Sequence, residues 1–399
     1  WVDSPKRAQL LAWLTGIVIF IEGNITVLVA GAISRPLFDR YKCSREKLAY
    51  IIDSTSSPIC ILIPINAWGA YNLSILEGLG VEDALRVFLQ AVVLNFYAIA
   101  AVFMVLAVII WRIDLGPMKR AEARTRDGQV LWPDATPMID EEVLSPEPIE
   151  GVPARAVNMV MPIVTMVLFM PVALYVTGDG SLLDGSGSTS VLWSVMAGLA
   201  ISWIMLRWQR AFTTDQLVKI ALKGAGALVP LALIILLALA LGDVIEILGT
   251  GEYVAQVTAG TMPNFLYVPL VFLVSGGIAF ATGTSWGTFG IMLPIAVPAA
   301  LTLGLPLAPF VAASLAGGIF GDHCSPISDT TVLSSMSAAC DHMDHVRTQM
   351  PYALLVAVLA LLFGHLATSY GTPIWIAYGL SILILAGSVR FVGKSVSEL

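Results

Sequence analysis

Acidic side chains lie inside stretches of the sequence that are otherwise apolar. Asp322 and Asp329 flank the run Ser325-Pro-Ile-Ser328, and Asp53 precedes a run of hydroxyl residues. An ionised carboxylate in nonpolar surroundings is costly unless a partner compensates it, and these stretches contain no Lys or Arg. Carboxylates without basic partners bind protons or cations, so these residues are the first candidates for a functional site.

Hydroxyl and amide side chains near these carboxylates complete a set of oxygen ligands. Hard cations such as Na⁺ take oxygen ligands. A single Ser or Thr can instead hydrogen-bond between helices, and Asp243 could lie at the membrane interface, so the whole set supports the hypothesis. The candidate ion-binding residues are Asp53, Ser54, Thr55, Asn66, Asp243, Thr282, Thr284, Ser285, Asp322, Ser325, Ser328, Asp329 and Thr330.

The elements that carry these residues are apolar segments long enough to cross a bilayer. The chain is 57% hydrophobic and only 12% charged, and no charged side chain occurs from Tyr253 to Gly321. A soluble domain has about a quarter charged residues. We therefore predict an all-α polytopic membrane protein with about eleven hydrophobic segments, each near the roughly 20 residues that a span needs. They are Ala8–Ala32, Leu48–Leu76, Ala84–Trp111, Ala156–Thr177, Val191–Leu206, Ala225–Leu248, Phe265–Ala281, Trp286–Leu303, Pro309–Cys340, Tyr352–Tyr370 and Ile374–Val389.

Three of these segments should be broken or re-entrant helices. The breaks fall at Asp53–Pro58, Thr282–Gly287 and Gly321–Thr331, where Pro, Gly and polar residues interrupt the apolar pattern. Irregular backbone at membrane depth persists only when it is buried in protein or lines a wet cavity, and transporters use it to bind ions. Ser57-Pro-Ile-Cys60 and Ser325-Pro-Ile-Ser328 would cross the membrane in opposite directions, which indicates an inverted repeat.

Basic residues in the short loops predict the orientation and the division of the chain. The loop Arg35–Lys47 and the hydrophilic segment Asp114–Arg155 are rich in Lys and Arg and should face the cytoplasm. The segment Asp114–Arg155 is expected to be a mobile linker between a first transmembrane half, Trp1–Ile113, and a second, Ala156–Leu399.

The start of the chain departs from this orientation rule. Lys6 and Arg7, just before the predicted span Ala8–Ala32, fall on the outer side. The first residue is Trp1 rather than Met, and no signal peptide pattern follows it. We therefore expect that N-terminal spans are missing.

Four stretches carry a resemblance to a known family. Gly321-Asp-His-Cys-Ser-Pro-Ile-Ser-Asp-Thr-Thr331, Cys340–Tyr352, Thr282–Gly290 and Tyr50–Pro58 resemble signatures of the NhaC-type Na⁺/H⁺ antiporters, within the wider ion-transporter superfamily. The resemblance covers most of the chain. It implies exchange of Na⁺ for H⁺ across the inner membrane, with Na⁺, H⁺ and the lipid bilayer as partners. Some similar proteins carry organic solutes, so a Na⁺- or H⁺-coupled transporter of a small organic acid or amino acid is the alternative.

Other chemistries fit the sequence less well. Gly283-Thr-Ser-Trp-Gly287 matches the nucleophile elbow of hydrolases, but membrane spans flank it, so no enzyme is expected. The histidines and cysteines match no zinc spacing. His342 and His345 are expected in a solvated helix end, with pH sensing left open, and His365 in a packed helix. We expect no cofactor and no nucleic acid, and a homodimer is left open.

Overall fold

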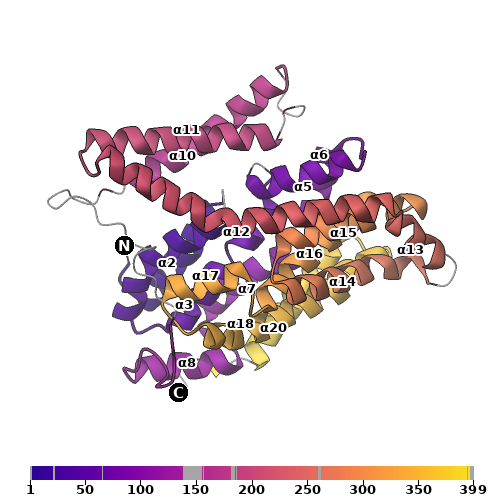
Figure 1. Cartoon of the computed structure of the whole chain (residues 1–399). Helices are drawn as coiled ribbons and strands as arrows, with labels where there is room; N and C mark the ends of the chain where they lie inside the picture. The colour runs from indigo at the N-terminus through magenta and orange to yellow at the C-terminus, as the bar shows by residue number, and fades with distance from the viewer. Residues whose placement is uncertain are drawn as a thin grey trace.

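The computed structural model describes residues 2–20, 23–64, 66–137, 155, 157–180, 185, 187–258, 262–392 and 394–395. In these residues the fold is a bundle of helices (Figure 1), and the two strands have two residues each. Strand β1, Ile113–Asp114, pairs antiparallel with β2, Lys394–Ser395, and so joins the ends of two helices that are far apart in the sequence.

The helices of the first half and of the segment after it are short, and several follow each other after a break. They are α1 (Pro5–Val18), α2 (Gly23–Arg40), α3 (Arg45–Asp53), α4 (Ser57–Leu62), α5 (Ala67–Gly78), α6 (Ala84–Val93), α7 (Phe96–Trp111) and α8 (Gly116–Arg126).

The second half contains longer helices and a π-helical turn. Its elements are α10 (Val157–Thr177), α11 (Gly187–Trp208), α12 (Thr214–Ile247), α13 (Thr250–Thr258), η1 (Asn264–Leu266), α14 (Tyr267–Thr282), α15 (Ser285–Thr302), α16 (Leu307–Cys324), α17 (Asp329–Ala338), α18 (His342–Leu359), the π-helical η2 (Ala360–Leu366), α19 (Ala367–Ser369) and α20 (Ile374–Val392).

Helix length and composition confirm a multi-pass membrane protein. Four helical stretches in the described residues are long and apolar enough to cross a bilayer: Val160–Thr177, Asn264–Thr282, Ser285–Thr302 and His342–Ser369. Two bent helix pairs, α3–α4 with α5 and α6 with α7, raise the number to six. Each of the sequence-predicted segments contains helix, but breaks divide several of them into shorter pieces.

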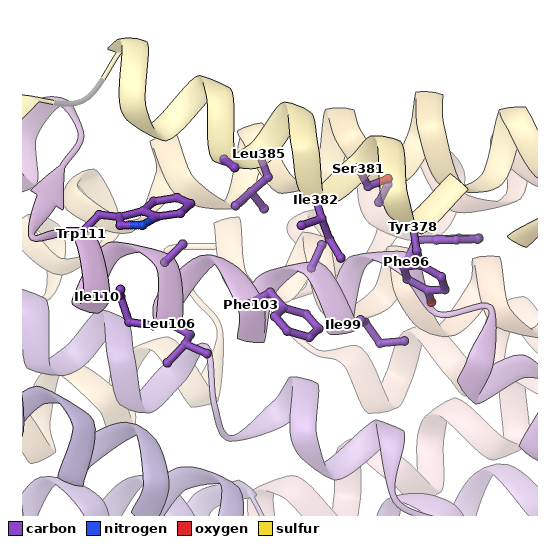
Figure 2. Close-up of a pocket in the computed structure, with 14 residues that line it drawn as sticks. Phe96, Ile99, Phe103, Leu106, Ile110, Trp111, Tyr378, Ser381, Ile382 and Leu385 are labelled. Atoms are coloured by element: carbon purple, nitrogen blue, oxygen red, sulfur yellow. The ribbon is translucent and has the colours of Figure 1, made fainter. Parts of the chain in front are cut away.

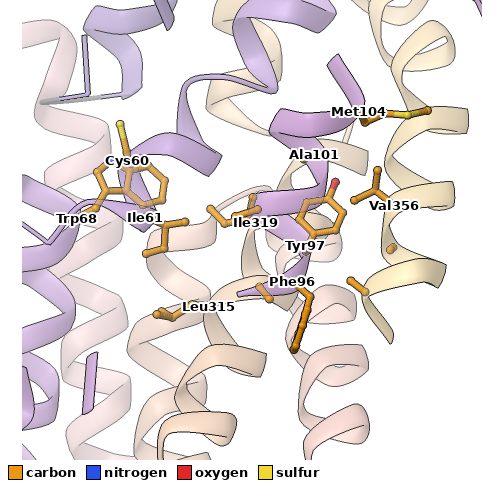
Figure 3. Close-up of a cluster of buried hydrophobic side chains, with 14 of the residues drawn as sticks. Cys60, Ile61, Trp68, Phe96, Tyr97, Ala101, Met104, Leu315, Ile319 and Val356 are labelled. Carbon is orange, nitrogen blue, oxygen red and sulfur yellow. The ribbon is translucent and has the colours of Figure 1, made fainter. Parts of the chain in front are cut away.

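Small residues allow the helices of the second half to pack closely. A Cβ atom added to Gly317 would lie 2.3 Å from the carbonyl oxygen of Phe272, and one added to Gly321 would lie 2.2 Å from that of Gly276. Helices α14 and α16 can therefore approach each other to backbone contact, as small residues permit in membranes. The buried apolar core continues from α16 to α4, α7 and α18, where Ile61, Tyr97, Ile319 and Val356 lie together (Figure 3).

The periphery is apolar as well. Helices α10 and α11 form a hairpin beside the main bundle, and α12 runs from it across α15 (Figure 1). Leu168 and Leu192 in this hairpin are exposed, as lipid-facing residues are. A groove of about 200 Å³ between α7 and α20 is also almost entirely apolar, with Phe103 and Ile382 in its lining (Figure 2). It offers no polar cluster that could bind an ion.

The segment Ala8–Ala32 is not one span, which corrects the predicted topology. Helices α1 and α2 pack against each other as a hairpin. The hydroxyl of Tyr41, after α2, donates a hydrogen bond to the carbonyl of Val2, before α1, at 2.9 Å. Both ends of the hairpin are therefore on the same side. Lys6 then lies beside the basic loop after α2, and the exception to the orientation rule disappears.

The start of the predicted mobile linker Asp114–Arg155 is folded. Helix α8 packs against α3, and the Arg124 guanidinium makes two hydrogen bonds with the buried Glu46 carboxylate, at 2.7 and 3.0 Å. Buried Lys47 pairs with Asp114 at 2.9 Å. The sequence suggested a linker because this segment is charged, but Asp114, Glu122 and Arg124 are buried against α3 or the residue that caps it instead of solvated. Residues 138–154 and 156 lie outside the described residues.

We predict that the start of α1 and the end of α8 face the same compartment. Asp3→Cys and Asp127→Cys should both resist a membrane-impermeant thiol reagent in intact cells and react after permeabilisation, because the hairpin returns the chain to its starting side. The four native cysteines are buried and give little background. Glu82→Cys, in the loop after α5, is the control that should react in intact cells. Labelling of Asp3→Cys and Asp127→Cys from opposite sides would contradict the hairpin.

Candidate functional site

Four helix ends meet at two of the predicted breaks. Helix α14 ends at Gly283, whose φ of +68° is left-handed and whose close contact with the Ile327 carbonyl leaves no room for a Cβ atom. Helix α15 then begins after Thr284, which caps it by accepting a hydrogen bond from the Gly287 amide. Helix α16 ends at Cys324, and Ser328 caps the start of α17.

Asp322 lies at this junction and is fully buried. Its Oδ2 accepts hydrogen bonds from the hydroxyls of Ser285, on α15, and Thr330, on α17, each at 3.3 Å. Its Oδ1 has no hydrogen-bond partner among the described residues. The breaks therefore place two hydroxyls on one oxygen of the carboxylate and leave the other oxygen open.

Asp53 is the second fully buried carboxylate, at the end of α3 where the first predicted break begins. Its Oδ2 accepts a hydrogen bond from the side-chain amide of Gln349 at 2.6 Å and lies 3.5 Å from Nε2 of His345. Its Oδ1, like that of Asp322, has no partner among the described residues. Asp53 therefore faces two polar groups of α18 but has the same unfilled oxygen.

Thr331 connects Asp53 with Asp322. Its hydroxyl lies 3.5 Å from Oδ2 of Asp53 and 3.4 Å from the backbone carbonyl of Asp322. A hydroxyl carries one proton, so it can donate to one of these acceptors at a time. Gln349 adds a second link, because its amide also donates to the carbonyl of His323, the residue after Asp322, at 3.0 Å. Residues from both halves of the chain thus form one polar cluster.

The cluster contains more buried polar atoms than its hydrogen bonds satisfy. Besides the two carboxylate oxygens, Oε1 of Gln349 and Nε2 of His323 have no partner within the described residues. Buried polar groups are nearly always hydrogen-bonded, so a group of unsatisfied ones requires an explanation. The two carboxylate oxygens can each accept a proton or a cation. Such an arrangement can hold a small positive ion in a site closed to water.

Asp329 lies at the edge of the cluster. It is half-buried, and its carboxylate accepts a hydrogen bond from the amide of Thr330 at 2.9 Å. As the first residue of α17 it also benefits from the partial positive charge of a helix N-terminus. Its charge is thus partly compensated by backbone, whereas the buried Asp322 relies on hydroxyls.

Several other predicted site residues have structural partners instead. Asn66 caps α5 and donates to the carbonyls of Phe20 and Cys60. The Ser325 hydroxyl donates to the Phe280 carbonyl. The Thr55 hydroxyl donates to a carbonyl one turn earlier in α3, at Ile51. Ser54 is buried at the end of α3.

Two predicted residues lie outside the cluster. Asp243 is exposed on α12, and Thr282 is exposed at the end of α14, where its hydroxyl donates to the Ile278 carbonyl. Residues at helix ends near a break thus resemble ion ligands in sequence, although backbone groups or solvent already satisfy them.

Helix α18 supplies site residues that the sequence did not indicate. His345 was expected in a solvated helix end, but it is fully buried beside Asp53, so that expectation is wrong. Asp341 caps α18 by accepting a hydrogen bond from the Asp344 amide, which starts the helix just before His345. His345 and Gln349 are then four residues apart and share one helix face. In the sequence, the capping residue Asp341 followed by His345 and Gln349 at helical spacing was the pattern that could have indicated these site residues.

His342 is also ordered, at the start of α18. Its Nε2 lies 2.6 Å from the carbonyl of Pro326, in the break between α16 and α17, and its Nδ1 lies 3.2 Å from the Ser335 hydroxyl. His342 therefore connects the break between α16 and α17 to α18, the helix that faces Asp53. His365 packs between the rings of Phe96 and Phe272, as the sequence predicted for a histidine inside a helix.

The remaining chemistries gain no support from the geometry. The Ser285 hydroxyl of the Gly283–Gly287 motif donates to Asp322 rather than to a histidine. In the part of the chain that the structure describes, no group of three or more His, Cys, Asp and Glu side chains could hold a metal ion.

Comparisons with known proteins identify the family. Residues 59–367 match the Na⁺/H⁺ antiporter family. An uncharacterised Haemophilus influenzae protein is 32% identical over 98% of this chain and 77% of its own length. The Halobacterium salinarum arginine/ornithine antiporter ArcD is 31% identical, over 50% of this chain and 39% of its own. The Bacillus subtilis malate-2H⁺/Na⁺-lactate antiporter is 35% identical, over 29% of this chain and 27% of its own. Since the family match covers residues 59–367, more than half of the chain, the chain belongs to the Na⁺/H⁺ antiporter family and is a multi-pass secondary transporter.

Proposed function

We propose that the protein exchanges Na⁺ for H⁺ across the cytoplasmic membrane at the cluster around Asp53 and Asp322, with Asp329 at its edge. One observation carries this proposal. Both carboxylates are fully buried, each has an oxygen without a hydrogen-bond partner, and neither makes an ion pair with a Lys or Arg of the described chain. A bound cation or a proton can compensate such charges, and the family matched by the chain exchanges these two ions.

The two carboxylates differ in what compensates their charge. Asp53 faces the Gln349 amide and the His345 ring, which can carry a positive charge. Among the described residues, Asp322 receives only hydroxyl hydrogen bonds, from Ser285 and Thr330. We therefore assign the alternation between H⁺ and Na⁺ to Asp322, with Asp53 as the acid that shares the site's charge. Hydroxyls suit both states, because they donate to a carboxylate and offer oxygen to Na⁺.

Competition for one carboxylate produces exchange. A buried Asp322 is stable when it holds either ion, and unstable when it holds neither. The site then crosses between the two sides only in an occupied state, which couples the two fluxes. Asp53 and Asp322 are both inaccessible to solvent in this structure, so it corresponds to a closed state. The helix breaks on both sides of the cluster are the places where the backbone can move to open it.

Transport of a small organic acid or amino acid with Na⁺ or H⁺ is the second candidate. Relatives named for arginine and ornithine, and for malate and lactate, favour it. The capped N-termini of α15 and α17 lie at the cluster and could bind a carboxylate. Against it, the cavity beside Ser54, Tyr97 and His323 has only about 10 Å³, which is room for one water molecule. A cavity of this size next to the cluster would admit a small ion more readily than an organic solute.

The first prediction concerns Asp322. Asp322→Asn keeps the size of the side chain and most of its hydrogen bonds but cannot bind H⁺ or Na⁺ by charge. Na⁺-driven proton movement in everted vesicles should fall to background while the protein still inserts. Asp243→Asn is the matched control, because Asp243 is exposed on α12, and it should transport like the wild type. Near-normal exchange by Asp322→Asn would make this carboxylate structural.

The second prediction concerns the link between the halves. Gln349→Met conserves volume but removes the donor to Asp53 and to the His323 carbonyl, leaving two buried acceptors unsatisfied. The change should cost about 1–3 kcal/mol of unfolding free energy, seen as a lower unfolding temperature in detergent. Leu354→Met, on the exposed face of the same helix, is the control and should change little. Equal effects of the two variants would show that the Gln349 hydrogen bonds contribute nothing.

The third prediction separates exchange from solute-coupled transport. If H⁺ and Na⁺ compete for one carboxylate, lowering the pH should raise the apparent KM for Na⁺, by up to about tenfold per pH unit, with little change in maximal rate. A Na⁺ pulse given to proteoliposomes without organic solute should expel protons. Should proton flux require an added acid or amino acid, the second candidate would replace the first.

A further inference from the structure

A basic pocket lies at the end of the bundle that carries the Arg35–Lys47 loop. It has a volume of about 240 Å³ and is formed by the start of α1, the loop between α2 and α3, the end of α7 and helix α8. Five lining side chains are basic and one is acidic: Lys6, Lys42, Lys47, Arg112 and Arg126, with Glu122. Because α1 and α2 form a hairpin, Lys6 from the first helix joins basic residues from four later elements: the loop between α2 and α3, the start of α3, the end of α7 and the end of α8.

Only part of this positive charge is compensated within the protein. Lys47 pairs with Asp114 at 2.9 Å. Lys6, Lys42 and Arg112 make no ion pair with any acid in the described residues, and the Lys42 ammonium donates only to the backbone carbonyl of Arg126, at 3.4 Å. These cations converge on one concavity, which focuses their potential and repels other cations.

The acidic residue of the pocket does not cancel this charge. The Glu122 carboxylate is buried and accepts hydrogen bonds from the amide and the hydroxyl of Ser44, each at 2.8 Å. Burial raises the pKa of Glu122, although Lys47 opposes this effect, and the negative charge of Asp114 raises it further. The acid is thus already engaged on the pocket floor, and three basic side chains remain for a ligand.

We propose that this pocket binds a phosphate group, from either a soluble phosphate or the headgroup of an anionic lipid. Guanidinium groups bind phosphate oxygens through paired hydrogen bonds, and ammonium groups add point charges. The volume suits a phosphate group or a small headgroup rather than a larger cofactor. Because the pocket opens where the basic loops predict the cytoplasmic membrane surface, both sources of phosphate would reach it.

Binding here would be coupled to the transport site through α3. Lys47 lies on the pocket lining and Asp53 follows it on the same helix, about 9 Å along the axis. A bound phosphate would tie α1, α7 and α8 to the start of this helix. It should therefore stabilise the folded bundle.

The test uses the purified full chain in nanodiscs and measures the unfolding temperature. One arm titrates potassium phosphate into phosphatidylcholine discs, against potassium chloride at equal ionic strength. The other arm replaces part of the phosphatidylcholine with phosphatidylglycerol. We expect at least one arm to raise the unfolding temperature, by about 2–4 °C when the ligand is roughly tenfold above its Kd. Stabilisation by phosphate identifies a soluble ligand, and stabilisation by phosphatidylglycerol identifies a lipid.

Substitutions locate the effect. The triple variant Lys6→Gln, Lys42→Gln, Arg112→Gln should lose the stabilisation, whereas Lys219→Gln, an exposed residue of α12, should keep it. If the triple variant does not fold, Lys42→Gln alone should raise the midpoint of the effective ligand severalfold, because Lys42 is exposed and no acid depends on it. The proposal is overturned if neither arm stabilises the wild type, or if the substitutions leave the stabilisation intact.

Discussion

The charge of two buried carboxylates, Asp53 and Asp322, is the constraint on which the other features of the structure depend. Removing an ionised carboxylate from water costs several kcal/mol even after relaxation, and these two have no Lys or Arg partner in the described chain. Helix breaks beside the two acids partly offset this cost, because they bring hydroxyls and capped helix N-termini to the carboxylates. The oxygen on each acid that has no partner among the described residues is the feature on which the proposed ion site rests.

Helix α3 shows how the same residue chemistry is used in two ways. Glu46, in its first turn, is fully buried and receives two hydrogen bonds from Arg124. That pair is complete, so removing either partner would leave a buried charge without compensation. Asp53, at the other end of the helix, is buried to the same extent but keeps one oxygen free. The complete pair anchors α8 to α3, whereas the free oxygen of Asp53 belongs to the proposed ion site.

The sequence predicted the local features of this site and missed the long-range ones. Breaks at Gly283 and Pro326 follow from the residues themselves, because glycine permits a left-handed backbone and proline lacks a donor, and Asp322 could be placed beside them. The partner of Asp53 could not be predicted in this way. His345 lies among Asp, His and Arg residues, which usually indicate solvent, and only the packing of α18 against α3 buries it.

The difference between local and long-range features also explains why some predicted site residues hydrogen-bond to the backbone instead of lining the cluster. Asn66 and Thr282 have the oxygen atoms that a cation needs, but each already satisfies a carbonyl or amide near a helix end. Residue type cannot separate these roles, because helix caps and ion ligands use the same functional groups. The hairpin of α1 and α2 was missed for a related reason. The segment Ala8–Ala32 is long enough for one span, and its length gave no reason to divide it.

Helix α18 connects the charge of Asp53 to contacts with the break between α16 and α17. One face of it reaches Asp53 through His345 and Gln349, and Gln349 also holds the His323 carbonyl at the end of α16. Near its start, His342 holds the Pro326 carbonyl inside the break. Hydrogen bonds to a charged carboxylate are about twice as strong as those to a neutral acid, so any share of the site's proton that Asp53 takes from Asp322 weakens the attachment of Asp53 to α18. The attachment of α18 to the α16–α17 break does not involve that charge and persists. If the cluster is the proposed exchange site, its occupancy would set how firmly α3 is held to α18, which is the kind of coupling that alternating access requires.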